Sequence, residues 1–186
     1  MMAHDPGRIE AVLDFWFAPG METRWFAADA ELDRELVERF GQDLAQAASG
    51  SLDHWVETAP GALALVILLD QMPRNVFRGK PQAFSFDSHA LAIAEAAILR
   101  GHDRLLDPIG RRFLYLPFEH SESLSDQRYC VTLFEMAGDD PEGLDYARKH
   151  LAVIERFGRF PHRNEVLERE TTPEEEEFLK GPDSRF

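Results

Sequence analysis

The order of apolar and polar residues along the chain predicts a series of helices, one of them central. Eight consecutive apolar residues run from Ala62 to Leu69, inside the stretch Pro60 to Gly79, PGALALVILLDQMPRNVFRG. A helix that is apolar on every side has to be buried on every side, so we predict that this segment crosses the core. Pro60 suits the first turn of a helix, where its missing N–H is no loss, and Pro73 is expected to end or kink the helix.

Other segments repeat apolar residues every three or four positions, the spacing of a helix that buries one face. Asp29 is expected to cap the helix that follows it, and Val37 lies in the apolar stripe of that helix. Near the C-terminus, Tyr146 falls on the apolar half of a helical wheel and His150 lies in its middle. The predicted amphipathic helices are Arg8 to Phe17, the segment from the Asp29 cap to Ala48, Phe84 to Arg100, Pro108 to Phe118, Ser123 to Ala137 and Pro141 to Phe157.

The loops carry weaker signals. Trp25 and Phe26 are expected to anchor their loop in the core, and Asn164 to Arg169 is expected to form a short helix. Thr172 resembles a helix cap, because Pro173 and several acids follow it. No segment alternates convincingly with period two, so we predict no sheet. We therefore expect an all-α protein of seven to eight helices, stacked as antiparallel hairpins in a single domain of residues 1–186.

Composition and charge exclude several classes of function. The net charge of −14 and the pI near 4.9 argue against nucleic acid, because a protein that binds the phosphate backbone needs a basic face. The same charge argues against a membrane surface, and no apolar run reaches the ~20 residues that span a bilayer. The first residues lack a signal-peptide pattern, and the single Cys130 fits a reducing compartment. We therefore expect a cytoplasmic protein.

Three groups of polar residues interrupt strongly apolar surroundings and are the candidate sites. They combine carboxylates, amides, histidines and arginines. Arginine and amide donors suit a ligand that carries an anion or a carboxylate. The candidate ligand-binding residues are Asp70, Gln71, Arg74 and Asn75 in the first group, Glu119, His120 and Glu122 in the second, and His150, Arg159, His162 and Arg163 in the third.

Three interpretations of these groups stay open. In the first, they converge on a polar pocket for a small anionic ligand or a peptide carboxylate. In the second, Glu119, His120 and Asp70 serve as acid or base in a small hydrolase-like or metal-assisted enzyme. In the third, they only satisfy loop and helix-end groups of a helical scaffold. Neither His120 nor His150 has a carboxylate or histidine three or four residues away, so we expect no metal and no cofactor.

Four motifs follow one another along the chain: LLDQMPRNVFRG with AFSFDSHAL, then FLYLPFEHSE, then FGRFPHRNEVL, then ETTPEEEEFL. Together they resemble the bacterial family called domain of unknown function 924, over Ala11 to Leu179. The resemblance implies a fold similar to tetratricopeptide-repeat proteins, and it implies no activity or ligand. Where the family commonly has glycine this chain has Glu168, so the expected alternative to a tight turn is continued helix. A homodimer is a further expectation, by analogy with other stacked helical hairpins.

Overall fold

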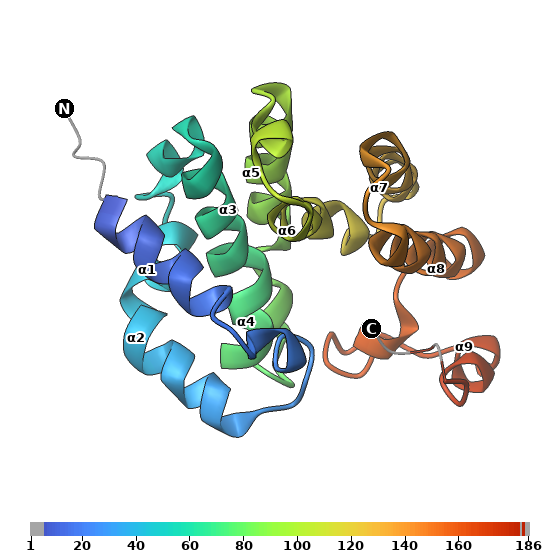
Figure 1. The fold of residues 1–186 in the computed structure, drawn as a ribbon. Coiled ribbons are helices and arrows are strands. Elements are labelled where there is room, and N and C mark those ends of the chain that lie inside the picture. Colours follow the sequence, from blue (N-terminus) through green and yellow to red (C-terminus); the bar gives the residue numbers. More distant parts are fainter. Residues whose placement is uncertain (1–5, 183, 185–186) are drawn as a thin grey trace. The chain divides into compact units, whose positions relative to one another are not determined.

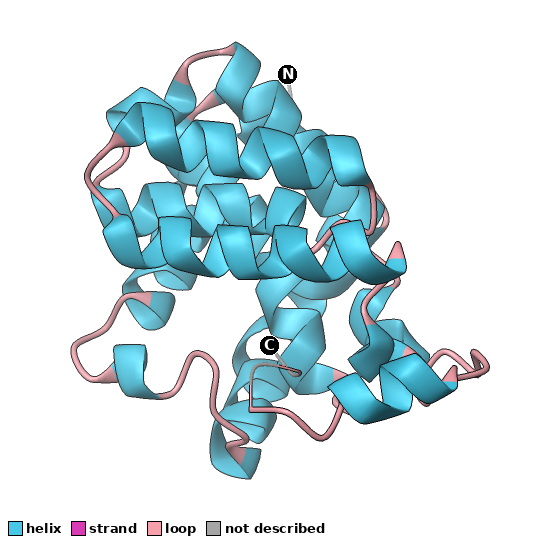
Figure 2. Ribbon diagram, turned by 90° about the vertical axis from the view of Figure 1, so that its right-hand side faces the viewer, coloured by secondary structure: helices cyan, strands magenta, loops and turns pink. Residues whose placement is uncertain are grey.

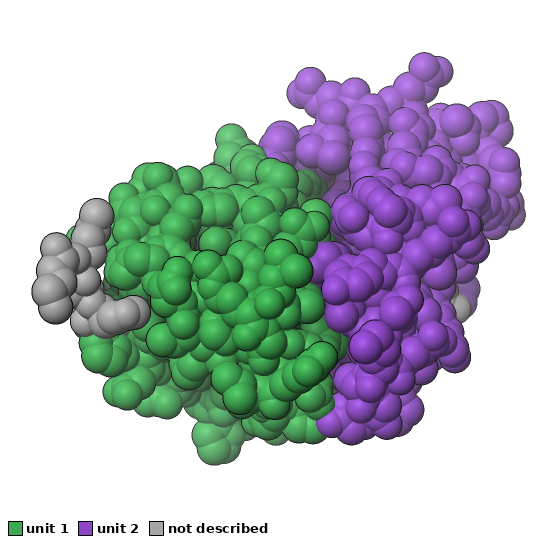
Figure 3. Space-filling model, turned by 90° about the horizontal axis from the view of Figure 1, so that it is seen from above, with its two compact units in different colours: residues 1–78, 82–117 green, residues 79–81, 118–186 purple. Residues whose placement is uncertain are grey.

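The computed structural model describes residues 6–182 and 184, and this part of the chain contains helices and no strand (Figure 2). The prediction of an all-α protein is therefore confirmed. The chain groups into two compact units, coloured separately in Figure 3 and described separately below. Unit 1 comprises residues 1–78 and 82–117, and unit 2 comprises residues 79–81 and 118–186. Among the described residues, no helix is both long enough and apolar enough to cross a membrane.

Unit 1 is organised around the apolar segment singled out above. The residues from Ala62 to Leu69 are almost completely shielded from solvent. This segment has α1 and α5 as neighbours (Figure 1). The helices of unit 1 are α1 (Pro6–Trp16), α2 (Ala30–Ala48), α3 (Ala59–Val66), α4 (Met72–Val76), α5 (Asp87–Leu99) and α6 (Pro108–Glu119), of which the last two residues belong to unit 2.

A widened turn joins α3 to α4, so the helical path continues past Pro73. Residues Ile67–Gln71 form a π-helical turn, and Pro73 lies in the first turn of α4. In a regular α-helix the ring of Pro73 would clash with the carbonyl of Leu69, four residues earlier. A π-turn changes the local spacing of the backbone and is a common way to relieve such a conflict. The same turn contains Asp70 and Gln71, so the first polar group begins in it.

Side-chain contacts show that neighbouring helices of unit 1 run antiparallel. Arg8, near the start of α1, forms an ion pair with Asp43, near the end of α2. On the far side of α3, Arg74 pairs with Asp87 and Arg100 pairs with Glu57. In these two pairs the residue that comes earlier on one helical segment, Glu57, meets the later residue on the other, Arg100, as expected for antiparallel neighbours. The expected antiparallel pairs are therefore present within unit 1, and the tetratricopeptide-like superhelix stays a prediction.

Unit 2 is built around one helical hairpin. It comprises α7 (Leu124–Ala137) and α8 (Pro141–Phe157), followed by the short α9 (Pro173–Phe178). Arg128 bonds Glu155 at 3.3 Å and Arg148 bonds Glu135 at 2.8 Å, so the two helices run antiparallel. The bounds of α8 match the predicted helix, and the predicted caps at Asp29 and Thr172 are confirmed by bonds to the backbone N–H groups of Leu32 and Glu175.

Three apolar side chains are more exposed than their patterns predicted. Phe26 is 70% exposed, Val37 is 50% exposed and Tyr146 is 46% exposed. Val37 and Tyr146 lie at the edges of their stripes, and periodicity alone does not say how far a neighbouring element covers such an edge. In the loop, only Trp25 acts as the expected anchor, because its indole N–H donates to the carbonyl of Trp16 at 2.8 Å.

The segment from Asn164 to Arg169 is a tight turn, which corrects the prediction of a short helix there. The N–H of Arg169 bonds the carbonyl of Asn164 at 2.8 Å, and the N–H of Glu168 bonds the carbonyl of Glu165 at 3.3 Å. This pair of bonds is the Schellman motif, which requires a left-handed residue. Glu168 takes that conformation, with φ of 53°. The expected continuation as helix is therefore wrong, and the turn forms without glycine.

We predict that Glu168→Gly stabilises the protein by about 0.5–1 kcal/mol, because a side chain in the left-handed conformation costs about 1–2 kcal/mol and glycine avoids that cost. The side chain of Glu168 makes no hydrogen bond or ion pair with the rest of the described chain, so little else changes. Glu165→Gly is the matched control, because Glu165 lacks a positive φ. That variant should lose about 0.5–1 kcal/mol. Urea unfolding of both variants measures the difference, and equal losses would contradict the prediction.

Candidate functional site

The first polar group lies in unit 1 and holds α4 to its neighbours. Asp70 is completely buried, and its Oδ2 accepts a bond of 2.5 Å from the amide of Gln71. Arg74 lies between two carboxylates: its Nη1 is 3.3 Å from Asp70, and its guanidinium bonds both oxygens of Asp87 at 3.0 and 3.1 Å. Burial alone would lower the pKa of Arg74, but these carboxylates raise it above its ordinary value.

Asp33 of α2 completes this group. The amide of Asn75 donates to Asp33 at 3.0 Å, and Arg78 bonds both oxygens of Asp33 at 3.0 Å. The guanidinium of each arginine is therefore paired with a carboxylate of the same unit. Sequence reasoning named Arg74 and missed Asp33 and Asp87, because their spacing from the arginines along the chain carries no signal of contact.

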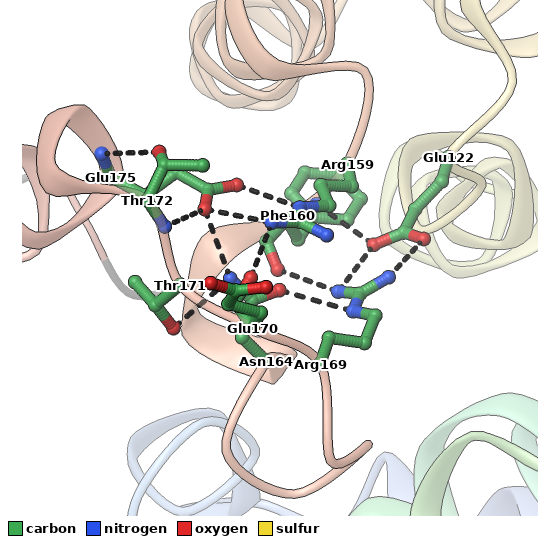
Figure 4. A network of polar contacts seen from close by, with 9 residues as sticks. All are labelled: Glu122, Arg159, Phe160, Asn164, Arg169, Glu170, Thr171, Thr172 and Glu175. Atoms are coloured by element: carbon green, nitrogen blue, oxygen red, sulfur yellow. Dashed lines mark hydrogen bonds and ion pairs between the residues drawn. The ribbon is translucent and has the colours of Figure 1, made fainter.

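The second and third polar groups, both in unit 2, meet in a network of ion pairs that we call the Glu122 network (Figure 4). Arg169 bonds the two oxygens of Glu122 at 2.7 and 3.0 Å. It also donates to the carbonyl of Phe160 and the side-chain oxygen of Asn164, each at 3.0 Å. Partial burial would raise the pKa of Glu122, but the bonds from Arg169 and from the N–H of Phe160 hold it below its ordinary value.

Arg159 and Glu175 form the other half of the Glu122 network. Arg159 bonds the two oxygens of Glu175 at 2.7 and 2.8 Å and the carbonyl of Glu170 at 2.7 Å. The bond from Arg159 lowers the pKa of Glu175 to about 2. Glu175 also accepts the N–H of Thr172 at 2.8 Å, which makes it the capping-box residue of α9. The capping pattern identified Glu175 as a helix residue, but nothing in the sequence identified it as the partner of Arg159.

His150 is the most deeply buried histidine among the predicted site residues. Its Nδ1 lies 2.9 Å from the carbonyl of Tyr146 and 3.4 Å from Oε1 of Glu119. A carbonyl only accepts, so the short contact places the proton on Nδ1. Burial, together with the neighbouring basic side chains, lowers the pKa of His150 to about 3 in spite of the bond to Tyr146, so the ring is neutral at physiological pH.

Two histidines and an arginine contact the ring of Phe160, and a third histidine lies beside one of them. His150 packs on Phe160 with ring centroids 5.6 Å apart, and His162 packs on it at 5.7 Å. His120 lies 6.3 Å from His150, and the guanidinium of Arg163 lies 4.6 Å from the centroid of Phe160. Arg163 also donates to the carbonyl of His120 at 3.0 Å. We call His120, His150, His162 and Arg163 the histidine cluster.

Two buried residues of α7 lie beside the end of α6. Gln127 donates to the carbonyls of Glu119 and Ser121 at 2.5 and 2.7 Å, so it closes the end of that helix. Burial raises the pKa of the Cys130 thiol, and the charge of Glu119 raises it further. Cys130 is therefore an unreactive thiol at neutral pH, as expected for a buried cysteine.

The structure thus brings together the predicted residues of the second and third groups within unit 2, and within unit 1 those of the first group form an ion-paired set. A search of the described residues finds no group of three histidine, cysteine, aspartate or glutamate side chains placed to hold a metal ion. The arginines of both ion-paired sets bind carboxylates of their own unit. The histidine cluster is therefore the part of the predicted site that we consider for function.

The fold and the sequence define an all-α bacterial protein class without an assigned activity. Residues 12–183 match the family described as bacterial protein of unknown function, DUF924, and this chain belongs to that family. Its structure is similar to that of the protein of unknown function ATU0120 from Agrobacterium tumefaciens, with a TM-score of 0.90 and 41% sequence identity. The match covers 96% of this chain and 100% of that chain. No curated protein matches this sequence.

We predict that Arg169→Ala lowers the free energy of unfolding by about 2–3 kcal/mol, because it leaves Glu122 without its ion partner and removes bonds to Phe160 and Asn164. Chemical denaturation measures the loss. Arg148→Ala is the control, since Arg148 and Glu135 form a pair whose side chains are 58% and 49% exposed. Such a surface pair contributes less than about 1 kcal/mol. Similar losses in the two variants would contradict a central role for Arg169.

The lowered pKa of His150 leads to a separate prediction, on how the stability of the protein depends on pH. The unfolded chain binds a proton at His150 below the ordinary pKa of 6.5, whereas the folded chain binds it only near 3. The stability from the neutral ring is complete above pH 6.5 and declines as the pH falls toward 3, by about 2 kcal/mol at pH 5. His150→Gln should flatten the stability profile between pH 7.5 and pH 5 by that amount. His89→Gln, in unit 1, is the control, and an unchanged slope in His150→Gln would contradict the assignment.

Proposed function

We propose that this protein binds a small organic anion, or the carboxylate of a peptide, at the histidine cluster of unit 2. The observation that carries the proposal is the packing of His150, His162 and the Arg163 guanidinium against the ring of Phe160, with the His120 ring beside His150. Imidazole and guanidinium N–H groups are donors suited to carboxylate and phosphate oxygens. A local excess of such donors stands out in a chain with a net charge of −14.

The proposal keeps only part of the site predicted from the sequence. Arg74 and Arg159 each bind a carboxylate of their own unit through two nitrogens, so their charge is already paired. The proposal therefore rests on His120, His162 and Arg163, which gather beside His150 and Phe160. His150 is neutral at physiological pH and is fixed in one tautomer by Tyr146. In the proposed site it therefore packs beside the ligand and contributes no charge.

The acid–base alternative is supported by one contact. That alternative uses Glu119, His120 and Asp70, and the contact joins Glu119 to a histidine outside it, His150, at 3.4 Å. A neutral imidazole beside a carboxylate is a common arrangement for a general base. Asp70, the third residue of that alternative, is paired with Arg74 and is fully buried. We therefore place the enzyme interpretation second to the binding interpretation. The expectations of a cytoplasmic location and of a homodimer also stay proposals.

The binding proposal is tested by NMR titration of the histidine side-chain signals with three probes: inorganic phosphate, succinate and an N-acetylated amino acid. We expect saturable shifts of the His120 and His162 signals with at least one probe. Arg163→Gln should weaken that binding by tenfold or more, because a charge-assisted hydrogen bond contributes about 1.5–3 kcal/mol. Arg163→Lys should recover part of the affinity, since it keeps the charge.

Arg148→Gln is the matched control, because Arg148 lies on the exposed face of α8 in a pair with Glu135. It should leave the affinity unchanged. Loss of binding to the same degree in Arg148→Gln would show that only net charge matters. Absence of saturable shifts with all three probes at millimolar concentration would refute the proposal and leave the histidine cluster with a structural role.

A further inference from the structure

One exposed face of α7 carries no charged side chain over nearly the whole helix. Ser125, Tyr129, Thr132 and Met136 follow one another at intervals of four, three and four residues, so they form a single stripe. All four are exposed, Tyr129 by 43% and Met136 by 74%. We call these four residues the α7 stripe. The buried residues of α7, among them Leu133 and Phe134, point to the core of unit 2 on a different side of the helix.

The composition of the α7 stripe is unusual for an exposed face of this protein. Charged residues make up 29% of the chain, and the outer face of α8 carries Asp145, Lys149 and Arg156. Tyrosine and methionine are enriched in protein interfaces, where charged residues are depleted. The spacing of the stripe is that of the contact positions of two packed helices. The stripe therefore has the pattern of a helix that packs against another helix.

The charges at the border of the stripe indicate which partner fits. Along one edge lie Arg128 and Glu135, seven residues apart, with opposite signs. Each is balanced by an α8 residue, since Arg128 bonds Glu155 and Glu135 bonds Arg148. This border is therefore neutral in sum, although the chain as a whole carries −14 and repels its own copies. Two copies that approach through this face therefore meet no net charge along this border.

We propose that the α7 stripe is the contact surface for a second copy of this chain, packed with the two α7 helices antiparallel about a two-fold axis near Thr132. A two-fold contact has to be self-complementary, because the same surface occurs on both sides. Antiparallel pairing centred on Thr132 brings Arg128 of one copy toward the region of Glu135 of the other. It also places Tyr129 of one copy against Met136 of the other, a favourable sulfur–aromatic contact.

The contact is small, so the proposed dimer is weak. Stable interfaces bury roughly 1,200 Å² or more, and one helical stripe of four residues provides less. We expect a dissociation constant of about 0.1 mM for the dimer. Sedimentation equilibrium from 10 μM to 1 mM should show the mass rise from 21.2 kDa toward twice that value. Thr132→Glu places two like charges at the axis and should weaken the dimer by at least tenfold. Ala152→Glu, on the exposed face of α8, adds the same charge elsewhere and should leave the dimer unchanged.

Cysteine cross-linking tests the axis itself. The only native cysteine, Cys130, is fully buried, so an engineered cysteine is the accessible thiol. Thr132→Cys should form a disulfide between copies under mild oxidation at least tenfold faster than Ala152→Cys. Ser125→Cys should also be slow, because antiparallel pairing about Thr132 separates its two copies by about 20 Å, at 1.5 Å per residue. Near-ultraviolet circular dichroism checks that each variant keeps its fold.

Three results would overturn the proposal. The first is a wild-type mass of 21.2 kDa up to 1 mM, which would mean that the stripe is bare or that a different protein covers it. The second is a dimer that Thr132→Glu and Ala152→Glu weaken equally. The third is cross-linking of Thr132→Cys that is no faster than that of Ala152→Cys. A mass that rises with concentration, together with selective effects at Thr132, supports the proposed axis.

Discussion

Unit 2 depends on the ion pair between Arg169 and Glu122. Glu122 lies in the loop between α6 and α7, and Arg169 follows the tight turn after α8, so the pair joins segments that are 47 residues apart. Both side chains are mostly shielded, at 22% and 29% exposure, and a shielded charge needs a partner with well-directed hydrogen bonds. Arg169 meets that requirement with four bonds, two of which hold the chain around Phe160 and Asn164. The left-handed conformation of Glu168 turns the chain so that Arg169 reaches these four acceptors. The bonds of Arg169 are therefore a physical reason to keep a strained backbone at Glu168.

The same requirement organises the first polar group in unit 1. Arg74 lies between Asp70 and Asp87, and Arg78 forms two hydrogen bonds with Asp33. In a chain with 34 acidic and 20 basic residues, carboxylates are abundant near every arginine. An arginine in such a protein is therefore as informative about internal architecture as about a ligand. That is why the binding site we propose uses the histidine cluster and leaves out the arginines that are paired with carboxylates.

The parts of the fold that depend on local chemistry could be predicted from the sequence. Periodicity located α8 to the residue, and the caps at Asp29 and Thr172 followed from side-chain chemistry within three residues of each helix start. Properties set by distant residues could not be predicted. Val37 is exposed because coverage of a stripe depends on its neighbours, and the partner of Arg159 is 16 residues away with no periodic signal between them. The tight turn at Glu168 could not be predicted, because the bonds that stabilise it come from the backbone and from Arg169. The sequence shows only that a glutamate, which disfavours a left-handed turn, stands at this position.

Phe160 connects the structural network to the candidate binding site. Its N–H and carbonyl are held by Glu122 and Arg169, while its ring contacts His150 and His162 and lies under Arg163. The ion pairs therefore fix the backbone of the residue around which the histidine cluster is arranged. A binding site needs donors held in place before the ligand arrives, because ordering them on binding costs affinity. The structural and functional interpretations of these polar motifs are thus compatible: the carboxylate–arginine pairs provide the rigid support, and the histidine cluster is the group they position.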